Sequence, residues 1–466
     1  MNDAVCVFTP VETLPAGTPE EVAGPAEAPV QRNQRLPALD VLRGFALLGI
    51  LMSNIEAFAG PEGLWGIPVG LPIPAFTGWH SGLDHSIVVL KWMFVEGKMR
   101  GMFSMLFGAG VILLTERLER CSGPVRAAGI YYRRNLWLLV FGLCHGFILW
   151  FGDILVDYSV MALVILYPLR RLGARALLIL GLTVWLVGGT VGSTRVFDVA
   201  GVLRADSELA AARASGPFAS EAQRDLLQAT ANQRQISAAT MKETLREERL
   251  GFLAGLSGRI ATEQGILKLK FGSFWVLEWL GAMITGMGLY KSGFLINKRP
   301  VREYVRLAFA GYAIALPLVL VGLWNVYKAG FTNAAFARWM AIPYSTEVMA
   351  GTLANVSILL LMVRSGWSRG IIGMVASVGR TAFSNYILTT IICRVLFAWG
   401  PWQLYGRLEY YQWYVIVAGV WAFNLIVSSL WLRIFAFGPL EWLWRSLTYW
   451  KRQPILLGEI QSIVFR

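Results

Sequence analysis

Long uninterrupted apolar runs constrain the fold of this chain more than any other feature. Several exceed about 18 residues, the length an α-helix needs to cross roughly 30 Å of hydrocarbon. The composition agrees, since 56% of the 466 residues are hydrophobic and only 15% are charged. A soluble domain usually carries about 25% charged residues, and a membrane β-barrel would show strict alternation instead of continuous runs. The sequence therefore predicts an all-α membrane protein.

Counting the apolar runs gives about ten transmembrane helices. The short basic loops fall on one side throughout, so the positive-inside rule predicts that both termini are cytoplasmic. The same rule accounts for the net charge of +13. The predicted parts are a disordered cytoplasmic tail (1–36), helices one to five (37–193), a polar extracytoplasmic helical insert (194–270), helices six to ten (271–436) and a basic cytoplasmic tail (437–466).

The stretch from Tyr131 to Met161 contains the most informative residue, His145, which is one of three histidines in the chain. A basic pair precedes it, and Asp153 and Asp157 follow it. An ionisable group at membrane depth is costly unless it meets a partner or a water-filled cavity, so it is a functional-site hypothesis by default. In one continuous helix His145 and Asp153 would lie about 12 Å apart along the axis. They therefore cannot form a direct dyad within one helix.

Other charged residues fall within or beside apolar runs. Glu96, Lys98 and Arg100 lie beside Gly97 and Gly101, which predicts a break between a tilted amphipathic segment and a span at about 101–116. Such a break is tolerated where it lines a cavity or is covered by protein. A charged elbow at the outer interface is an equally good interpretation. In the first span, Asp40 and Arg43 are three residues apart and are expected to pair on one helical face.

Five stretches of the chain resemble the YeiB-type family of bacterial inner-membrane proteins. They are RLPALDVLRGFALLGIL (35–51), GKMRGMFSMLFGAG (97–110), RRNLWLLVFGLCHGFILWFGDIL (133–155), GRTAFSNYIL (379–388) and FGPLEWLWRSLTYWKRQP (437–454). The LDxLRG opening is also similar to that of transmembrane acyltransferases, which include the lysosomal heparan-α-glucosaminide N-acetyltransferase. This resemblance implies acyl-CoA (acetyl-CoA) as a cytoplasmic donor and a carbohydrate acceptor on the far side. By its order after the first span, His85 (or His80) matches the catalytic histidine of that lysosomal enzyme.

Acyl transfer needs a base for the nucleophile and a site for the acyl carrier. His145 is the candidate base, and it lies about 18 Å along the helix from Arg133, at 1.5 Å per residue. Arginines at the cytoplasmic end could hold the CoA phosphates. The candidate catalytic residues are His145, Asp153 and His85; the candidate donor-binding residues are Arg43, Arg133, Arg134, Arg380, Lys98 and Arg100; the candidate acceptor-binding residues are Asp157, Asn385 and Glu278.

Two other classes of function remain open at this point. Ten spans with buried charges and a glycine-broken helix also suit a proton-coupled transporter or exporter, although no second copy of LDVLRG or GKMRGMF marks an internal repeat. A non-catalytic assembly protein would use His145 for helix packing. The lipid bilayer is the expected partner, a homodimer stays open, and neither nucleic-acid binding nor a metal site is expected, since no basic aromatic motif or ligand spacing occurs.

Overall fold

The computed structural model describes residues 36–60, 78–216, 220–224 and 238–458, and statements on structure refer to these residues. The predicted tail at 1–36 and most of the predicted outer loop between the first two spans lie outside them. Helices dominate the described part, where an isolated bridge between Phe435 and Leu456 is the only strand-like pairing. The prediction of an all-α chain is confirmed.

The helices follow one another along the whole described chain, and five π-helical turns interrupt them. The α-helices are α1 (Pro37–Ala59), α2 (Ser81–Phe94), α3 (Lys98–Cys144), α4 (Leu155–Met161), α5 (Tyr167–Leu169), α6 (Ala174–Thr183), α7 (Gly189–Val196), α8 (Val199–Ser215), α10 (Ala238–Glu248), α11 (Leu256–Gly272), α12 (Val276–Lys291), α13 (Val301–Lys328), α14 (Asn333–Phe336), α15 (Tyr344–Ser365), α16 (Arg369–Arg380), α17 (Ala382–Arg394), α18 (Tyr410–Ile434) and α19 (Pro439–Tyr449). The π-helical turns are η4 (His145–Leu149), η5 (Ala162–Leu166), η6 (Val184–Gly188), η8 (Ala337–Ala341) and η9 (Val395–Trp399).

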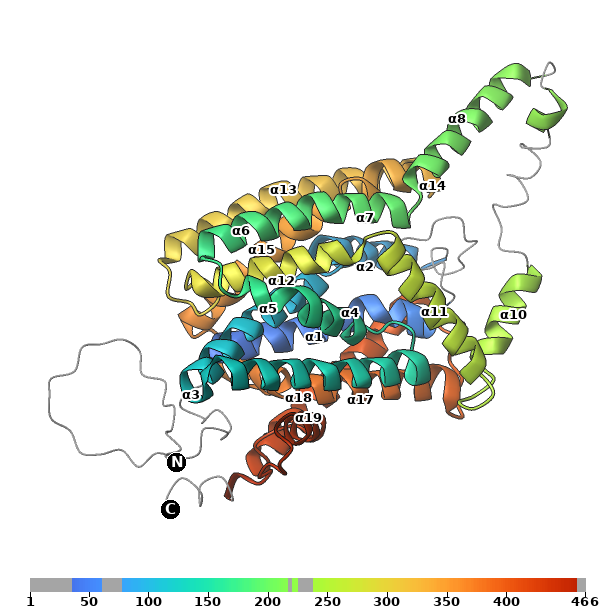
Figure 1. The fold of residues 1–466 in the computed structure, drawn as a ribbon. Coiled ribbons are helices and arrows are strands. Elements are labelled where there is room, and N and C mark those ends of the chain that lie inside the picture. Colours follow the sequence, from blue (N-terminus) through green and yellow to red (C-terminus); the bar gives the residue numbers. More distant parts are fainter. Residues whose placement is uncertain (1–35, 61–77, 217–219, 225–237, 459–466) are drawn as a thin grey trace, which may run out of the picture.

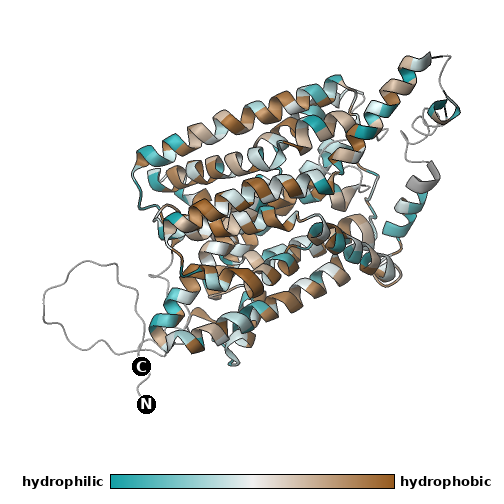
Figure 2. Ribbon diagram, turned by 45° about the horizontal axis from the view of Figure 1, so that its top comes forward, coloured by the Kyte–Doolittle hydropathy of each residue, from teal (hydrophilic) through white to brown (hydrophobic). Residues whose placement is uncertain are grey.

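Seven helical stretches in the described part are long and apolar enough to cross a membrane. One of them runs through α2, α3 and η4 and is far longer than a single crossing needs, and a shorter apolar stretch covers Leu155–Leu169. Apolar residues dominate the long helices, while polar residues gather at their ends and on α8 and α10 (Figure 2). The seven stretches are Pro37–Ala59, Ser81–Leu149, Ala174–Val196, Val301–Lys328, Tyr344–Ser365, Ala382–Trp399 and Tyr410–Ile434.

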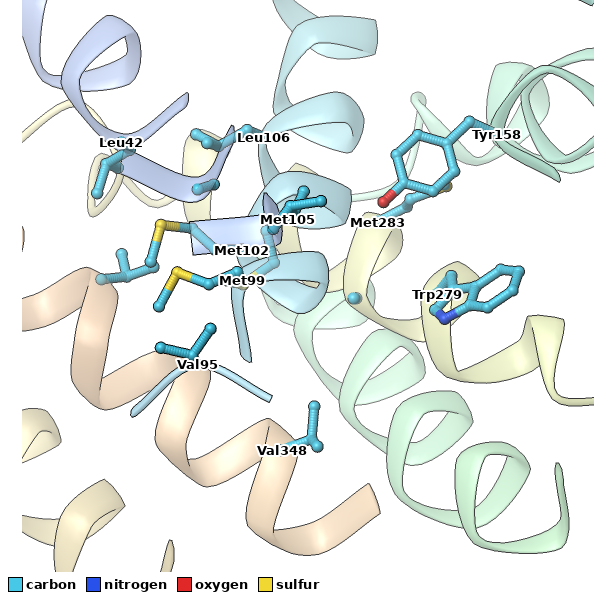
Figure 3. Close-up of a cluster of buried hydrophobic side chains, with 14 of the residues drawn as sticks. Leu42, Val95, Met99, Met102, Met105, Leu106, Tyr158, Trp279, Met283 and Val348 are labelled. Carbon is cyan, nitrogen blue, oxygen red and sulfur yellow. The ribbon is translucent and has the colours of Figure 1, made fainter. Parts of the chain in front are cut away.

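The long helices lie roughly side by side in one bundle, and α8 and α10 extend beyond it at one end (Figure 1). The first half of α3 occupies the centre of the core. Its Met99, Met102 and Met105 meet Leu42 of α1 and Val348 of α15 in the buried cluster of Figure 3. Unbranched methionine side chains fill irregular gaps of this kind, and α3 packs against α1, α4, α12 and α15.

Two breaks divide the long α2–α3 stretch. The chain turns at Gly97, whose φ of 68° is readily adopted only by a residue without a Cβ, and this confirms the predicted break. The second break lies at Gly123 (φ 74°), directly before Pro124, where an apparently continuous helix kinks. Predicted spans two and three therefore correspond to the two halves of α3, and its first half is longer than the predicted 101–116.

Candidate functional site

The chain leaves helical geometry directly after His145, and this departure builds the site. The helix loosens into η4 from His145, and Trp150 is fully extended (φ −165°, ψ 131°). Five residues later α4 begins, so Asp153 returns to the histidine instead of continuing along the helix. His145 and Asp153 can therefore make the contact that a single continuous helix would not allow. Isolated π-helical turns are frequent at functional sites.

His145 has a partner on each ring nitrogen. Its Nδ1 lies 2.8 Å from Oδ1 of Asp153, and its Nε2 lies 3.0 Å from Oγ1 of Thr390 on α17. The Val156 amide donates to Oδ2 of Asp153 (2.8 Å), which fixes the carboxylate. Because an ionised carboxylate only accepts hydrogen bonds, it favours a proton on Nδ1 and leaves Nε2 as the acceptor for the threonine hydroxyl. This is the geometry of a histidine oriented for general-base chemistry.

Helix α11, which belongs to the predicted insert, brings two charged residues to this centre. Nζ of Lys270 donates to Oδ2 of Asp157 (2.9 Å) and to the backbone carbonyl of Asp153 (2.7 Å). Glu263, two turns earlier on the same face of the helix, is fully buried. Asp157 is fully buried as well. The insert therefore forms part of the centre.

A cavity of about 140 Å³ lies beside the His145 centre. Asp153 and Lys270 line it on one side, and Glu96 and Arg100 line it on another. His145 does not line it, but Tyr386, whose ring centroid is 4.8 Å from that of His145, does. A second cavity of about 20 Å³, enough for one water molecule, adjoins Thr390 and Tyr386. The remaining polar and aromatic lining residues of the larger cavity include Ser53, Asn54, Trp150, Phe151, Trp275 and Trp279.

The charged elbow after Gly97 faces the protein interior. Arg100 donates to Oε1 of Glu278 (2.9 Å) and to the Tyr344 hydroxyl (3.1 Å). Lys98 is fully buried, donates to Glu347 and bonds the Trp92 carbonyl (2.7 Å), so it does not reach the cavity. Arg100 therefore borders the cavity, whereas Lys98 has a partner deep in the helix packing.

The predicted donor-binding arginines lie at helices α1, α3 and α16. Arg43 pairs with Asp40 (3.2 Å), as predicted. The guanidinium of Arg134 stacks 3.7 Å from the ring centroid of Trp444 on α19, and Arg43 and Arg445 both act on it electrostatically. Two neighbouring positive charges of this kind favour an anion. Two more predicted arginines belong to this group. Arg133 donates to the Thr448 carbonyl, and Arg380 lies at the end of α16.

Two predicted site residues lie outside the His145 centre. His85 on α2 bonds the Ser81 carbonyl through Nδ1 (2.7 Å), and its ring packs at 5.8 Å against that of Tyr327. Asn385 donates to Oγ of Ser428 on α18 (2.8 Å). Neither side chain lines the cavity beside His145.

Sequence reasoning missed four members of the centre: Thr390, Tyr386, Glu263 and Lys270. A threonine and a tyrosine in an apolar helix carry no signal, because both are ordinary packing residues there. Glu263 and Lys270 are seven residues apart and share a helical face, which could have been noticed. Nothing in the sequence indicated that this face is turned toward Asp153 and Asp157, more than a hundred residues away.

The fold and the site together define a helical membrane-type protein with a buried acid–base centre beside an internal cavity. Comparison with known proteins narrows this class. Residues 289–451 match the family described as "Protein of unknown function (DUF418)". The chain is 28% identical to "Uncharacterized protein YxaH" of Bacillus subtilis, over 92% of this chain and 97% of that protein. It is 29% identical to "Uncharacterized protein YeiB" of Escherichia coli, over 89% and 96%. The resemblance to YeiB-type proteins indicated by the sequence is confirmed, and none of these matches is to a named acyltransferase.

A third relative covers the chain to the same extent. It is the "Uncharacterized 39.9 kDa protein in amylase 3'region" of Bacillus acidopullulyticus, 25% identical over 92% of this chain and 98% of that protein. No solved structure gives a significant match. These descriptions name no activity, so the function must be argued from the residues of this chain.

Proposed function

We propose that the protein is a transmembrane acyltransferase in which His145 is the general base. The main observation behind this proposal is the hydrogen-bonded series Asp153–His145–Thr390, with 2.8 Å and 3.0 Å between the paired atoms. A carboxylate that orients a histidine, and a hydroxyl on the other ring nitrogen, are what base-assisted attack on a thioester requires. Thr390 supplies the hydroxyl in the free protein. The acceptor hydroxyl takes that position when Tyr386 moves aside.

The donor in this proposal is acyl-CoA, with acetyl-CoA as the simplest case. Arg43, Arg134 and Arg445 would bind its phosphates, since guanidinium groups recognise phosphate through paired hydrogen bonds. Along α3, His145 is about 18 Å from Arg133 at 1.5 Å per residue, a distance that an extended pantetheine arm can bridge. This arrangement supports delivery of the thioester from the arginine end.

The acceptor in this proposal is a carbohydrate that enters the 140 Å³ cavity. Trp275 and Trp279 offer flat apolar faces there, and Asn54 offers hydrogen-bonding atoms. Sugars present both an apolar ring face and hydroxyl groups, so this mixed lining suits them. Asp153 would contact the acceptor with the carboxylate that also orients His145.

The topology that suits this function has ten crossings with both termini in the cytoplasm of a bacterial inner membrane. Ten result from the seven candidate spans when Ser81–Leu149 is divided at Gly123 and both Leu155–Leu169 and α12 are added. The arginines then lie on the cytoplasmic side, and α8, α10 and α11 lie outside. Labelling of single cysteines from either side of the membrane tests this orientation.

The decisive experiment replaces His145 by alanine in protein reconstituted into nanodiscs. With acetyl-CoA as donor and a panel of mono- and disaccharides as acceptors, we expect release of the CoA thiol to fall by about 10²- to 10⁴-fold, the usual contribution of a general base. His85→Ala is the matched control, because His85 lies outside the centre, and it should retain activity. Unchanged turnover in His145→Ala would remove His145 from the mechanism.

A proton-coupled transporter is the second candidate, and the charged pairs around the cavity favour it. Lys91 pairs with Glu56 (2.6 Å), and Arg100 pairs with Glu278 (2.9 Å), all near the cavity that Glu96 lines. Buried ion pairs of this kind mark proton and ion pathways in transporters. Sugar uptake into proteoliposomes driven by a pH gradient, without any CoA, would favour this candidate over acyl transfer.

A further inference from the structure

Glu263 on α11 has an environment that an ionised carboxylate does not tolerate. Its side chain is fully buried, and neither carboxyl oxygen has a hydrogen-bond partner among the described residues. Lys270, on the same helix, is engaged by Asp157 and by the backbone of Asp153. A buried charge without donors costs several kcal/mol, so this carboxyl needs another means of compensation.

The carboxyl group of Glu263 is seated against the backbone beside His145. A Cβ atom added to Gly146 would lie 2.6 Å from Oε1 of Glu263 and 3.4 Å from Cβ of Asp153. Only glycine allows this close approach between α11 and η4. The glutamate therefore reaches the His145 centre itself.

The charged groups around Glu263 come from every element packed there. Asp153 from the turn after η4 and Asp157 from α4 add negative charge, and Lys270 opposes them. His145 faces the same group through its bond to Asp153. Among the described residues no group of three His, Cys, Asp or Glu has the arrangement to hold a metal ion, so a proton is the simplest neutralising ligand.

The pKa of Glu263 points in the same direction. This pKa is raised to about 8, chiefly by burial; Lys270 opposes the rise, and the negative charges of Asp153 and Asp157 add to it. Helix α11 is not one of the candidate spans. A carboxyl group on an undocked, water-exposed α11 would return to the ordinary range near 4.3.

We propose that Glu263 is a proton-binding site, and that a proton on its carboxyl group holds α11 against η4 at the His145 centre. Loss of the proton leaves a charged carboxylate in this buried position and releases α11 from η4. Since α11 contributes Ile266, Leu269 and Lys270 to the cavity wall, its release opens that wall and removes Lys270 from Asp157. Protonation therefore controls access to the cavity from the insert side. This inference holds for either candidate function.

The direction of the pH effect follows from the two protonation equilibria. Because the docked state binds the proton more tightly, docking is fully stabilised below the undocked pKa near 4.3. Its stability is lost as the pH rises toward about 8 and is constant above that value. One proton is released on undocking, so the docking equilibrium falls up to about tenfold for each pH unit in this window.

Hydrogen–deuterium exchange of the full-length protein in nanodiscs tests the proposal. Protection of the peptides covering 256–272 is measured between pH 5.5 and 8.5, corrected for the intrinsic exchange rate. Wild-type protection should fall up to about tenfold per pH unit. Glu263→Gln keeps a neutral side chain of the same shape, so its protection should stay high and independent of pH.

Glu243→Gln on α10 is the matched control, since Glu243 is exposed and pairs with Arg246 (3.1 Å). It should follow the wild-type profile. A wild-type profile without slope, or the wild-type slope retained in Glu263→Gln, would overturn the proposal. The proposal would also be overturned if α11 of Glu263→Gln stayed undocked at every pH. Docking would then need the carboxyl group for something other than its proton.

Discussion

Two groups of buried charges each contribute to the lining of the same cavity, the first through Arg100 and the second through Asp153 and Lys270, and they differ in charge balance. In the first, each cation has a close carboxylate partner: Lys91 with Glu56, Lys98 with Glu347, and Arg100 with Glu278, while Lys91 also lies 3.8 Å from Glu96. We call these six residues the paired cluster. In the second, Asp153, Asp157 and Glu263 share Lys270, and we call these four the insert cluster.

This difference in balance distinguishes charges that hold the helices together from charges that serve function. Pairing one to one compensates the desolvation of both ions and fixes the register of the helices that carry them. Where carboxyl groups outnumber the cations beside them, one carboxyl group can bind and release a proton, which is a common property of functional sites. The insert cluster also contacts the oriented histidine, whereas the paired cluster ties α1, α2, α3, α12 and α15 together.

The largest expected effect comes from breaking the paired cluster at Lys98. Lys98→Met leaves Glu347 buried without its cation, and we expect a loss of about 3–5 kcal/mol in the free energy of unfolding, as for other broken buried pairs. Denaturation in mixed detergent micelles measures it. The double variant Lys98→Met with Glu347→Leu removes both charges and should recover most of the stability. A single variant as stable as the wild type would show that the pair does not hold the helices.

A smaller effect is expected at the contact between α11 and η4. In Gly146→Ala the new methyl group would lie 2.6 Å from Oε1 of Glu263, so the buried Glu263 side chain or α11 itself must shift, with an overpacking cost of about 1–3 kcal/mol. Faster hydrogen exchange across 256–272 measures the loss. Gly110→Ala on α3 is the control, since an added Cβ meets nothing within 4 Å there. It should stabilise α3 by up to about 1 kcal/mol. Equal exchange in the two variants would contradict the seating of Glu263.

The same comparison explains what the sequence could predict. Apolar runs indicated the helical membrane class, and the cost of a charge in lipid indicated His145, Lys98 and Arg100 as residues with partners. The partners themselves lie far along the chain: Glu347 is 249 residues from Lys98. Helical periodicity carries no information about such contacts.

The His145–Asp153 contact was missed for a different physical reason. Its eight-residue spacing is incompatible with one helix, and the chain avoids that limit by unwinding at Trp150. Gly152 permits a turn there, but the sequence does not indicate which side chains that turn brings together. The role of α11 was missed because its polar composition indicated a solvated insert, not a wall of the site.

The smallest expected effect lies outside both clusters, at Glu243 and Arg246 on α10. Their side chains are 55% and 71% exposed, so water competes with the pair, and Glu243→Gln should change the free energy of unfolding by less than about 1 kcal/mol. Thermal unfolding at low and high salt measures it, with Arg246→Gln as the matched variant. The pair joins one cation to one carboxylate, as Lys98 and Glu347 do, and it differs from them in burial. If Glu243→Gln destabilised the protein as much as Lys98→Met, burial could not be what gives the paired cluster its strength.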